Sequence, residues 1–359
     1  MQNTNKATIK YDFIDALRFI SMVSIVMEHS SLLLGKNFTS VSDQLVQVTT
    51  IQLFKYGTII FFLVSGFLIG DKFETYSSGE YLKRRWDNTF KPWVFWFVVA
   101  IGLNYLNLYI VYAKFGMKDI LQDPWGTFLH QLYDTLFLTS LWFIVNFLIC
   151  IAILLMFRRY IDSLIFGAIL CAFSLFYSVN LYYVWVPPGH TVAIFGFVFY
   201  LWLGYKINKN FAAFTNWVNK TSTWYFALAF LVTYALSCWE SMAMIQHHNP
   251  ESMNTLRFTN ILYTLACFVL FFKYYKIFHA ELFKPRMLTF GIYFLHHILL
   301  NHVVPEIFRP LGYHNEDYRP MWQMLSMSLV QFVVAYGLSI GLAYLIAKGP
   351  KKISWIVGQ

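Results

Sequence analysis

Residues 13–34 read FIDALRFISMVSIVMEHSSLLL, an apolar run that is long enough to cross a bilayer as a helix. The run nevertheless carries four ionisable side chains, which are Asp15, Arg18, Glu28 and His29. Ionisable groups at membrane depth are costly unless they are paired or line a water-filled cavity. The run therefore predicts a helix that contributes to a functional site, and not a simple membrane anchor.

The spacing of these residues indicates which of them share a face. Arg18 and His29 are eleven positions apart, which on an α-helix is about three turns plus about 20°, or about 16 Å along the axis. Asp15 lies one turn before Arg18 and can pair with it. Glu28 adjoins His29 in the chain but points about 100° further round the helix, so it is the weaker candidate for orienting the imidazole.

The composition places the chain among multi-pass membrane proteins. Of its 359 residues, 58% are hydrophobic and only 13% are charged, and the mean hydropathy is +0.52. The net charge of +9 comes from short basic clusters between apolar runs, which is the pattern of topology signals. We therefore expect membrane lipids as surroundings and no nucleic-acid partner.

The cysteine positions argue against a metal site, and the N-terminal apolar run argues against a signal peptide. Cys150, Cys171, Cys238 and Cys267 lie in or beside apolar runs without CxxC spacing, so we expect small core residues and no metal site. The run 13–34 is too long and too charged for a signal peptide, and we expect it to stay in the mature protein.

The apolar segments predict an all-α integral membrane protein, a single bundle of about ten transmembrane helices. Their approximate cores are 13–34, 51–70, 93–112, 138–157, 162–183, 190–205, 222–240, 258–272, 287–304 and 322–347. The connections between these segments alternate in charge: one set carries 19 Lys and Arg residues and the other set carries 7. Arg18, which lies inside the first segment, accounts for the remaining one of the 27. Positive charge favours the cytoplasmic side, so both termini are expected in the cytoplasm and the 241–257 loop outside.

A second motif lies in the next apolar segment, where residues 61–69 read FFLVSGFLI. Ser65 and Gly66 have small side chains, so another helix or a ligand can approach the backbone closely. The sequence leaves both readings open.

Together, the arginine–histidine pair and the FFxxSGFLI run resemble the first two helices of the acyltransferase-3 membrane proteins. Residues 140–144, SLWFI, are similar to the family's LWFL-type start of the fourth helix. Residues 291–296, GIYFLH, are similar to a late YxxH pattern. The resemblance extends from the first apolar segment to the ninth.

The resemblance implies one acyltransferase domain over residues 1–359, with a cytoplasmic segment 1–12, a bundle 13–347 and a cytoplasmic tail 348–359. It implies transfer of an acyl group, most simply acetyl, from cytoplasmic acyl-coenzyme A to a hydroxyl of an envelope glycan or lipid-linked sugar at the inner membrane. Acetyl-coenzyme A would be a co-substrate, with no tightly bound cofactor and no metal. The acceptor and the oligomeric state stay open, a homodimer included.

Within this family His29 is expected to act as general base, because the unperturbed pKa of an imidazole is near neutrality, or to carry the acyl group covalently. Arg18 is expected to bind a phosphate of the donor or to fix the donor in place. The spacing of about 16 Å between them is close to the reach of an extended pantetheine arm.

A basic cluster, Lys83-Arg84-Arg85, precedes Lys91 and Pro92. Related proteins often have two arginines here with two residues between them, but Asn88 occupies the position of the second. Lys91 can replace it as a point charge. The cluster suits the phosphates of coenzyme A, and its alternative reading is ordinary positive-inside charge.

Two further side chains are secondary candidates. Trp142 can stack on a sugar, line a cavity or sit at the membrane interface, and His296 is a second polar candidate late in the chain. A transporter or flippase with a charged first helix is an alternative function. A structural membrane subunit is another.

Overall fold

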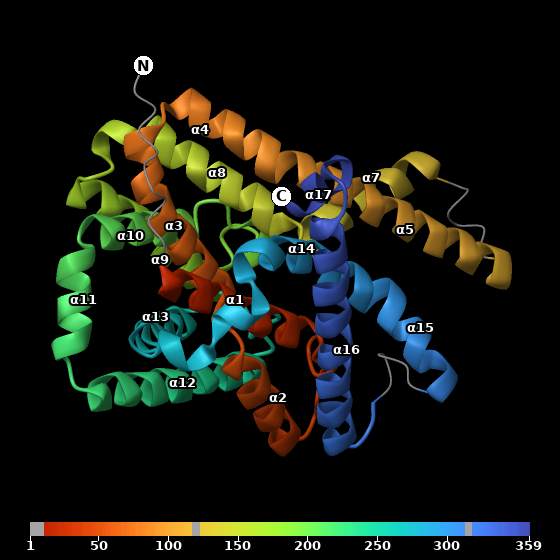
Figure 1. The fold of residues 1–359 in the computed structure, drawn as a ribbon. Coiled ribbons are helices and arrows are strands. Elements are labelled where there is room, and N and C mark those ends of the chain that lie inside the picture. The colour runs from red at the N-terminus through yellow and green to blue at the C-terminus, as the bar shows by residue number, and fades with distance from the viewer. Residues whose placement is uncertain (1–10, 117–122, 313–317) are drawn as a thin grey trace.

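The computed structural model describes residues 11–116, 123–312 and 318–359, which form helices and no strand (Figure 1). The predicted N-terminal segment 1–12 lies almost wholly outside the described residues. The longer helices are α1 (Asp12–His29), α2 (Val41–Leu53), α3 (Gly57–Thr75), α4 (Ser78–Arg85), α5 (Lys91–Phe115), α7 (Pro124–Phe137), α8 (Trp142–Met156), α9 (Leu164–Tyr183), α10 (Val198–Lys209), α11 (Phe211–Lys220), α12 (Thr223–Gln246), α13 (Phe258–Lys273), α14 (Pro285–Ile298) and α16 (Met321–Lys348). Shorter pieces are α15 (Val304–Phe308) and α17 (Lys351–Ser354).

Helix α1 lies among other helices and packs against α3, α13, α14 and α16. It ends at His29, five residues before the predicted end of the apolar run at residue 34. The Ser30 hydroxyl donates to the Val26 carbonyl at 2.7 Å, and the Ser31 N–H bonds to the Glu28 carbonyl. Serine side chains that bond to the backbone in this way compete with a continuing helix, and His29 is thereby placed in the last turn.

Helices α3 and α10 approach each other through two glycines. A Cβ atom on Gly66 would lie 1.9 Å from the Leu201 carbonyl oxygen, and one on Gly204 would lie 2.0 Å from that of Leu63. No larger side chain fits at either contact without moving a backbone. Gly66 therefore serves helix packing, which is one of the two readings that the sequence left open.

Two helices contain a wide turn just before a proline. The π-turn Trp86–Phe90 joins α4 to α5 two residues before Pro92, and the π-turn Leu299–Val303 joins α14 to α15 two residues before Pro305. Proline lacks an N–H and its ring crowds the carbonyl four residues earlier, so a straight α-helix is disfavoured there. π-turns of this kind are often found at functional sites.

Within the described residues, six helical stretches are long and apolar enough to cross a membrane, or seven if the bent pair α7–α8 counts as one span. The six are Val41–Thr75, Ser78–Lys114, Leu164–Tyr183, Thr223–Gln246, Pro285–Leu311 and Met321–Lys348. The predicted count of about ten is not confirmed. Helix α1 carries too many charges to be counted, while α10 and α13 have only 12 and 16 residues. The prediction of an all-helical, multi-pass membrane protein agrees with these helices.

Candidate active site

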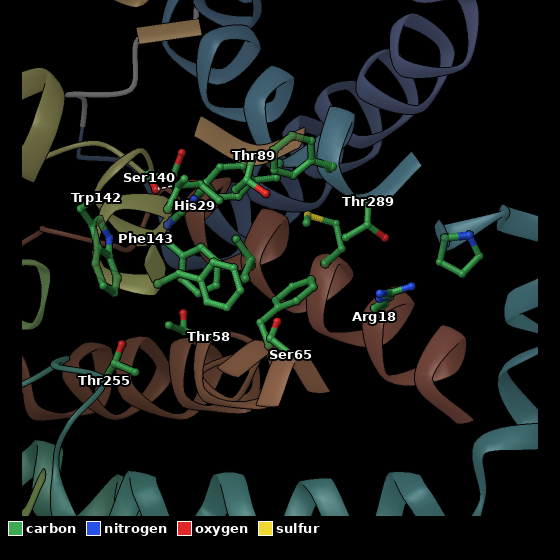
Figure 2. A pocket seen from close by; sticks show the side chains of 18 of the residues that line it. Arg18, His29, Thr58, Ser65, Thr89, Ser140, Trp142, Phe143, Thr255 and Thr289 are labelled. Carbon is green, nitrogen blue, oxygen red and sulfur yellow. Dashed lines mark hydrogen bonds between the residues drawn. The ribbon is translucent and has the colours of Figure 1, made fainter. Parts of the chain in front are cut away.

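One cavity of about 230 Å³ lies between α1, α3, α8 and α14, with the π-turn after α4 completing its wall. Helix α1 contributes Arg18, Glu28 and His29 to the lining. Figure 2 shows Arg18 on one side of the cavity and His29 on the other. The helical spacing predicted this arrangement, because residues on one face of a helix can line one cavity at two depths.

The histidine end of the cavity is built around a pair of imidazoles. Nδ1 of His29 lies 3.0 Å from Nε2 of His296, and the planes of the two rings are nearly parallel, 8° apart, with ring centroids 5.3 Å apart. His29 is exposed to the cavity, whereas His296 is completely buried. Nδ1 of His296 lies 3.0 Å from the Ile292 carbonyl oxygen, one turn earlier on α14. The pair joins the end of α1 to α14 across 267 positions of the chain.

An ion pair lies beside the histidines. The ammonium of Lys55, between α2 and α3, donates to a carboxylate oxygen of Glu28. The Lys55 side chain is 3% exposed and that of Glu28 is 13% exposed. Sequence reasoning placed Lys55 in an exterior connection and missed this contact. The Glu28 carboxylate therefore pairs with Lys55, while His296 contacts His29.

The opposite end of the cavity is cationic, with Arg18, Arg85 and Arg286 in its lining. Nε of Arg286 lies 2.9 Å from both carboxylate oxygens of Asp15, and Nη1 of Arg18 lies 3.7 Å from the same carboxylate. Asp15 therefore pairs with Arg18, as its spacing predicted, and also with Arg286 from the start of α14. Arg18 and Arg286 share this one carboxylate, and Arg85 adds a third guanidinium to the lining, so an excess of positive charge remains that favours an anionic ligand.

Arg85 is held in place by aromatic side chains. Its Nε and Nη2 donate to the Tyr81 hydroxyl at 2.9 and 2.6 Å, and its guanidinium lies 5.9 Å from the centre of the Phe147 ring. These contacts leave part of its fork of donors available to the cavity.

The chain matches the acyltransferase-3 family model, described as an acyltransferase domain, over residues 11–348. It belongs to the acyltransferase-3 family. No curated protein and no solved structure matches it. The resemblance drawn from the motifs is confirmed, and the protein is a membrane acyltransferase by family.

The other members of the family's basic cluster lie away from this cavity. Arg84 stacks on the Tyr76 ring at 4.6 Å, and Lys91 pairs with Asp87 at 2.5 Å on an exposed helix surface. Neither residue is in the cavity lining. Consecutive helical residues point about 100° apart, so Arg84 and Arg85 face different surroundings.

The remaining family motifs meet at the cavity. Ser65 lines it from α3, although its neighbour Gly66 packs against α10. Trp142 lines it at the start of α8 and is 8% exposed, with its ring edge-on to His190 at 5.3 Å. His190 also lines the cavity and was not predicted as a site residue, because no spacing in the sequence links it to Trp142.

Ser140 is a further residue that sequence reasoning did not single out. It lies in the bend between α7 and α8, lines the cavity and is 6% exposed. Its Oγ has no hydrogen-bond partner among the described residues, while its carbonyl accepts a hydrogen bond from the Tyr293 hydroxyl. A buried polar atom without a partner is unusual, and at a cavity wall a bound ligand can supply the partner.

The same described residues contain no group of three or more His, Cys, Asp or Glu side chains arranged to hold a metal ion.

Proposed function

We propose that this protein transfers an acyl group, most simply acetyl, from acyl-coenzyme A to a hydroxyl of an envelope glycan or of a lipid-linked sugar. The observation that supports the proposal is that Arg18 and His29 line one cavity. A phosphate-binding end and a proton-accepting end in the same cavity are what such a reaction requires.

The donor would bind with its phosphates at the arginine end. Arg18, Arg85 and Arg286 supply the guanidinium groups, and charge-assisted hydrogen bonds to phosphate are among the strong ones. The rise of an α-helix separates Arg18 from His29 by about 16 Å, close to the reach of an extended pantetheine arm. The thioester would then lie beside His29, within the bundle. Arg84 and Lys91 would act only as long-range positive charge.

The reaction needs one base at the histidine end. The acceptor hydroxyl gives its proton to the ring nitrogen of His29 that is not bonded to His296, and its oxygen attacks the thioester carbonyl. The carbon–sulfur bond then breaks, and the leaving thiolate takes the proton from His29, which yields an ester and free coenzyme A. A covalent acyl–His29 intermediate would use the same nitrogen as the nucleophile.

The proposal also includes an orientation in the inner membrane, with both termini cytoplasmic. The uneven distribution of Lys and Arg between the two sets of connections supports this orientation. Two of the 7 basic residues assigned to the outer set strengthen the asymmetry. Lys55 and Arg257 are 3% and 0% exposed and are bonded within the bundle, so they are not topology signals. A Ser252→Cys variant should react with a membrane-impermeant thiol reagent in intact cells; labelling only after lysis would contradict this orientation.

The decisive experiment gives purified protein acetyl-coenzyme A labelled in the acetyl group, together with a mixture of envelope glycans. We expect release of free coenzyme A and label on the glycan, both lowered by about 10²–10⁴-fold in His29→Ala and retained in His297→Ala. Movement of a labelled glycan across a proteoliposome membrane without thioester cleavage would instead identify a transporter or flippase.

A further inference from the structure

The hydrogen bonds of His296 determine which of its nitrogens carries a proton. Nδ1 of His296 lies 3.0 Å from the Ile292 carbonyl oxygen, and Nε2 lies 3.0 Å from Nδ1 of His29. A carbonyl oxygen can only accept a hydrogen bond, so Nδ1 of His296 must be the donor. The remaining question is whether Nε2 of the same ring also carries a proton.

The surroundings of His296 answer that question. The side chain is completely buried, and both ring nitrogens face neutral partners, so an imidazolium there would be uncompensated. A neutral imidazole with its proton on Nδ1 has a lone pair on Nε2. Nε2 of His296 therefore accepts, and Nδ1 of His29 is the donor.

The tautomer of His29 follows from the same bond. With its proton on Nδ1, the neutral His29 ring has its lone pair on Nε2. Its hydrogen bonds within the described part of the chain involve Nδ1 alone, and the residue lines the cavity. The nitrogen that can take up a proton is thus the one without a protein partner.

We propose that His296 is a positioning residue that fixes His29 as the Nδ1–H tautomer and presents Nε2 to the substrate. This inference rests on the proposed acyl transfer and identifies the group that makes His29 effective. As Nε2 of His29 takes the hydroxyl proton, its ring becomes cationic and the bond from its Nδ1–H to His296 becomes charge-assisted. His296 itself is anchored by the Ile292 carbonyl, so the alignment is held from α14.

Three substitutions at His296 separate positioning from packing. A glutamine side chain is long enough to place its amide oxygen near the position of Nε2, whereas asparagine reaches only the position of Nδ1 and leucine offers no acceptor. His296→Leu and His296→Asn should lower kcat by about 10- to 100-fold with unchanged KM for acyl-coenzyme A, as expected for losing one bond to a group that becomes charged. His296→Gln should keep kcat within a few-fold of wild type.

Two controls accompany these variants. His297→Leu changes the neighbouring histidine, which bonds to Asn301 and does not line the cavity, and should leave kcat unchanged. In a His29→Ala background, His296→Leu should cause no further loss, because His296 acts through His29. A further loss there, or a glutamine variant as poor as the leucine variant, would overturn the proposal.

A chemical readout tests the tautomer without any acyl transfer. Diethyl pyrocarbonate places an ethoxycarbonyl group on an unprotonated imidazole nitrogen and releases ethanol and carbon dioxide, and mass spectrometry measures the rate at His29. This rate should fall about tenfold or more in His296→Leu and His296→Asn but not in His296→Gln. Equal rates in all four proteins would overturn the positioning role. If the reaction rates at His29 are as expected but the protein transfers no acyl group, only the proposed function is overturned.

Discussion

The two ends of the cavity are held together by different kinds of interaction. At the arginine end, Arg18 and Arg286 share the carboxylate of Asp15, and their side chains are 26% and 48% exposed. At the histidine end, His296 is completely buried, and Lys55 is nearly so. A long, highly charged donor can be bound by charge with some freedom of position, whereas proton transfer requires a fixed geometry. Substitutions at the charged end and at the fixed end should therefore have different effects.

The largest effect is expected at His29. His29→Ala should leave a folded protein that still binds acyl-coenzyme A, while transfer falls by about 10²–10⁴-fold, the usual contribution of a positioned base. His29→Gln should fail equally, because an amide forms hydrogen bonds but cannot take up a proton at neutral pH. Transfer assays and donor titrations on both variants measure this. Near-normal acylation by the glutamine variant would reduce His29 to a structural role.

The next largest effect is expected at the ion pair beside the histidines. Lys55→Ala should destabilise the protein by about 3–5 kcal/mol, because it leaves the Glu28 carboxylate without its partner in a mostly buried place. Thermal unfolding in detergent measures the change. The double variant Lys55→Met/Glu28→Gln removes both charges and should recover most of the loss. Equal unfolding temperatures for wild type and Lys55→Ala would show that the histidine end is wetter and more adaptable than we infer.

The arginine end should respond through donor affinity alone. Arg18→Ala, Arg85→Ala and Arg286→Ala should each weaken acyl-coenzyme A binding by about 1.5–3 kcal/mol, the contribution of one hydrogen bond to a charged group. Arg84→Ala is the matched control, since its guanidinium stacks on Tyr76 outside the cavity. Calorimetry on the four variants measures the affinities. A loss in Arg84→Ala as large as in Arg85→Ala would indicate that general positive charge, and not the cavity, holds the donor.

The part of this site that the sequence predicts is the part that lies on one helix. Helical periodicity places Arg18 and His29 on a common face, and Asp15 within reach of Arg18, and the structure shows both relationships. The pairing of His29 with His296 spans 267 positions of the chain, and that of Glu28 with Lys55 joins α1 to the connection between α2 and α3. No periodicity encodes such contacts, since they depend on how the helices pack.

The number of membrane spans is harder to predict from the sequence than the all-helical membrane class. Apolar runs such as 190–205 and 258–272 look like spans in composition. The first run, however, contains only the beginning of α10, a helix of 12 residues, and the second forms α13, a helix of 16 residues. Hydrophobicity is required both by lipid and by a protein core, so it does not distinguish a short buried helix from a full crossing.

The smallest effect is expected at Ser140, and it tests whether the histidine end also binds a substrate oxygen. The Ser140 hydroxyl lines the cavity and has no hydrogen-bond partner in the part of the chain that the structure describes, so Ser140→Ala should change the unfolding temperature little. If this hydroxyl donates to the thioester carbonyl, its removal should slow transfer by about 3- to 10-fold, the equivalent of one neutral hydrogen bond of about 0.5–1.5 kcal/mol.

Ser21 provides the matched control for this last experiment. Its hydroxyl is equally without a partner among the described residues and completely buried on α1, but it does not line the cavity. Both alanine variants should therefore resemble wild type in thermal unfolding, and only Ser140→Ala should lose activity in the transfer assay. Equal activities for the two variants would remove Ser140 from the substrate's surroundings and leave the imidazole pair as the polar centre of that end.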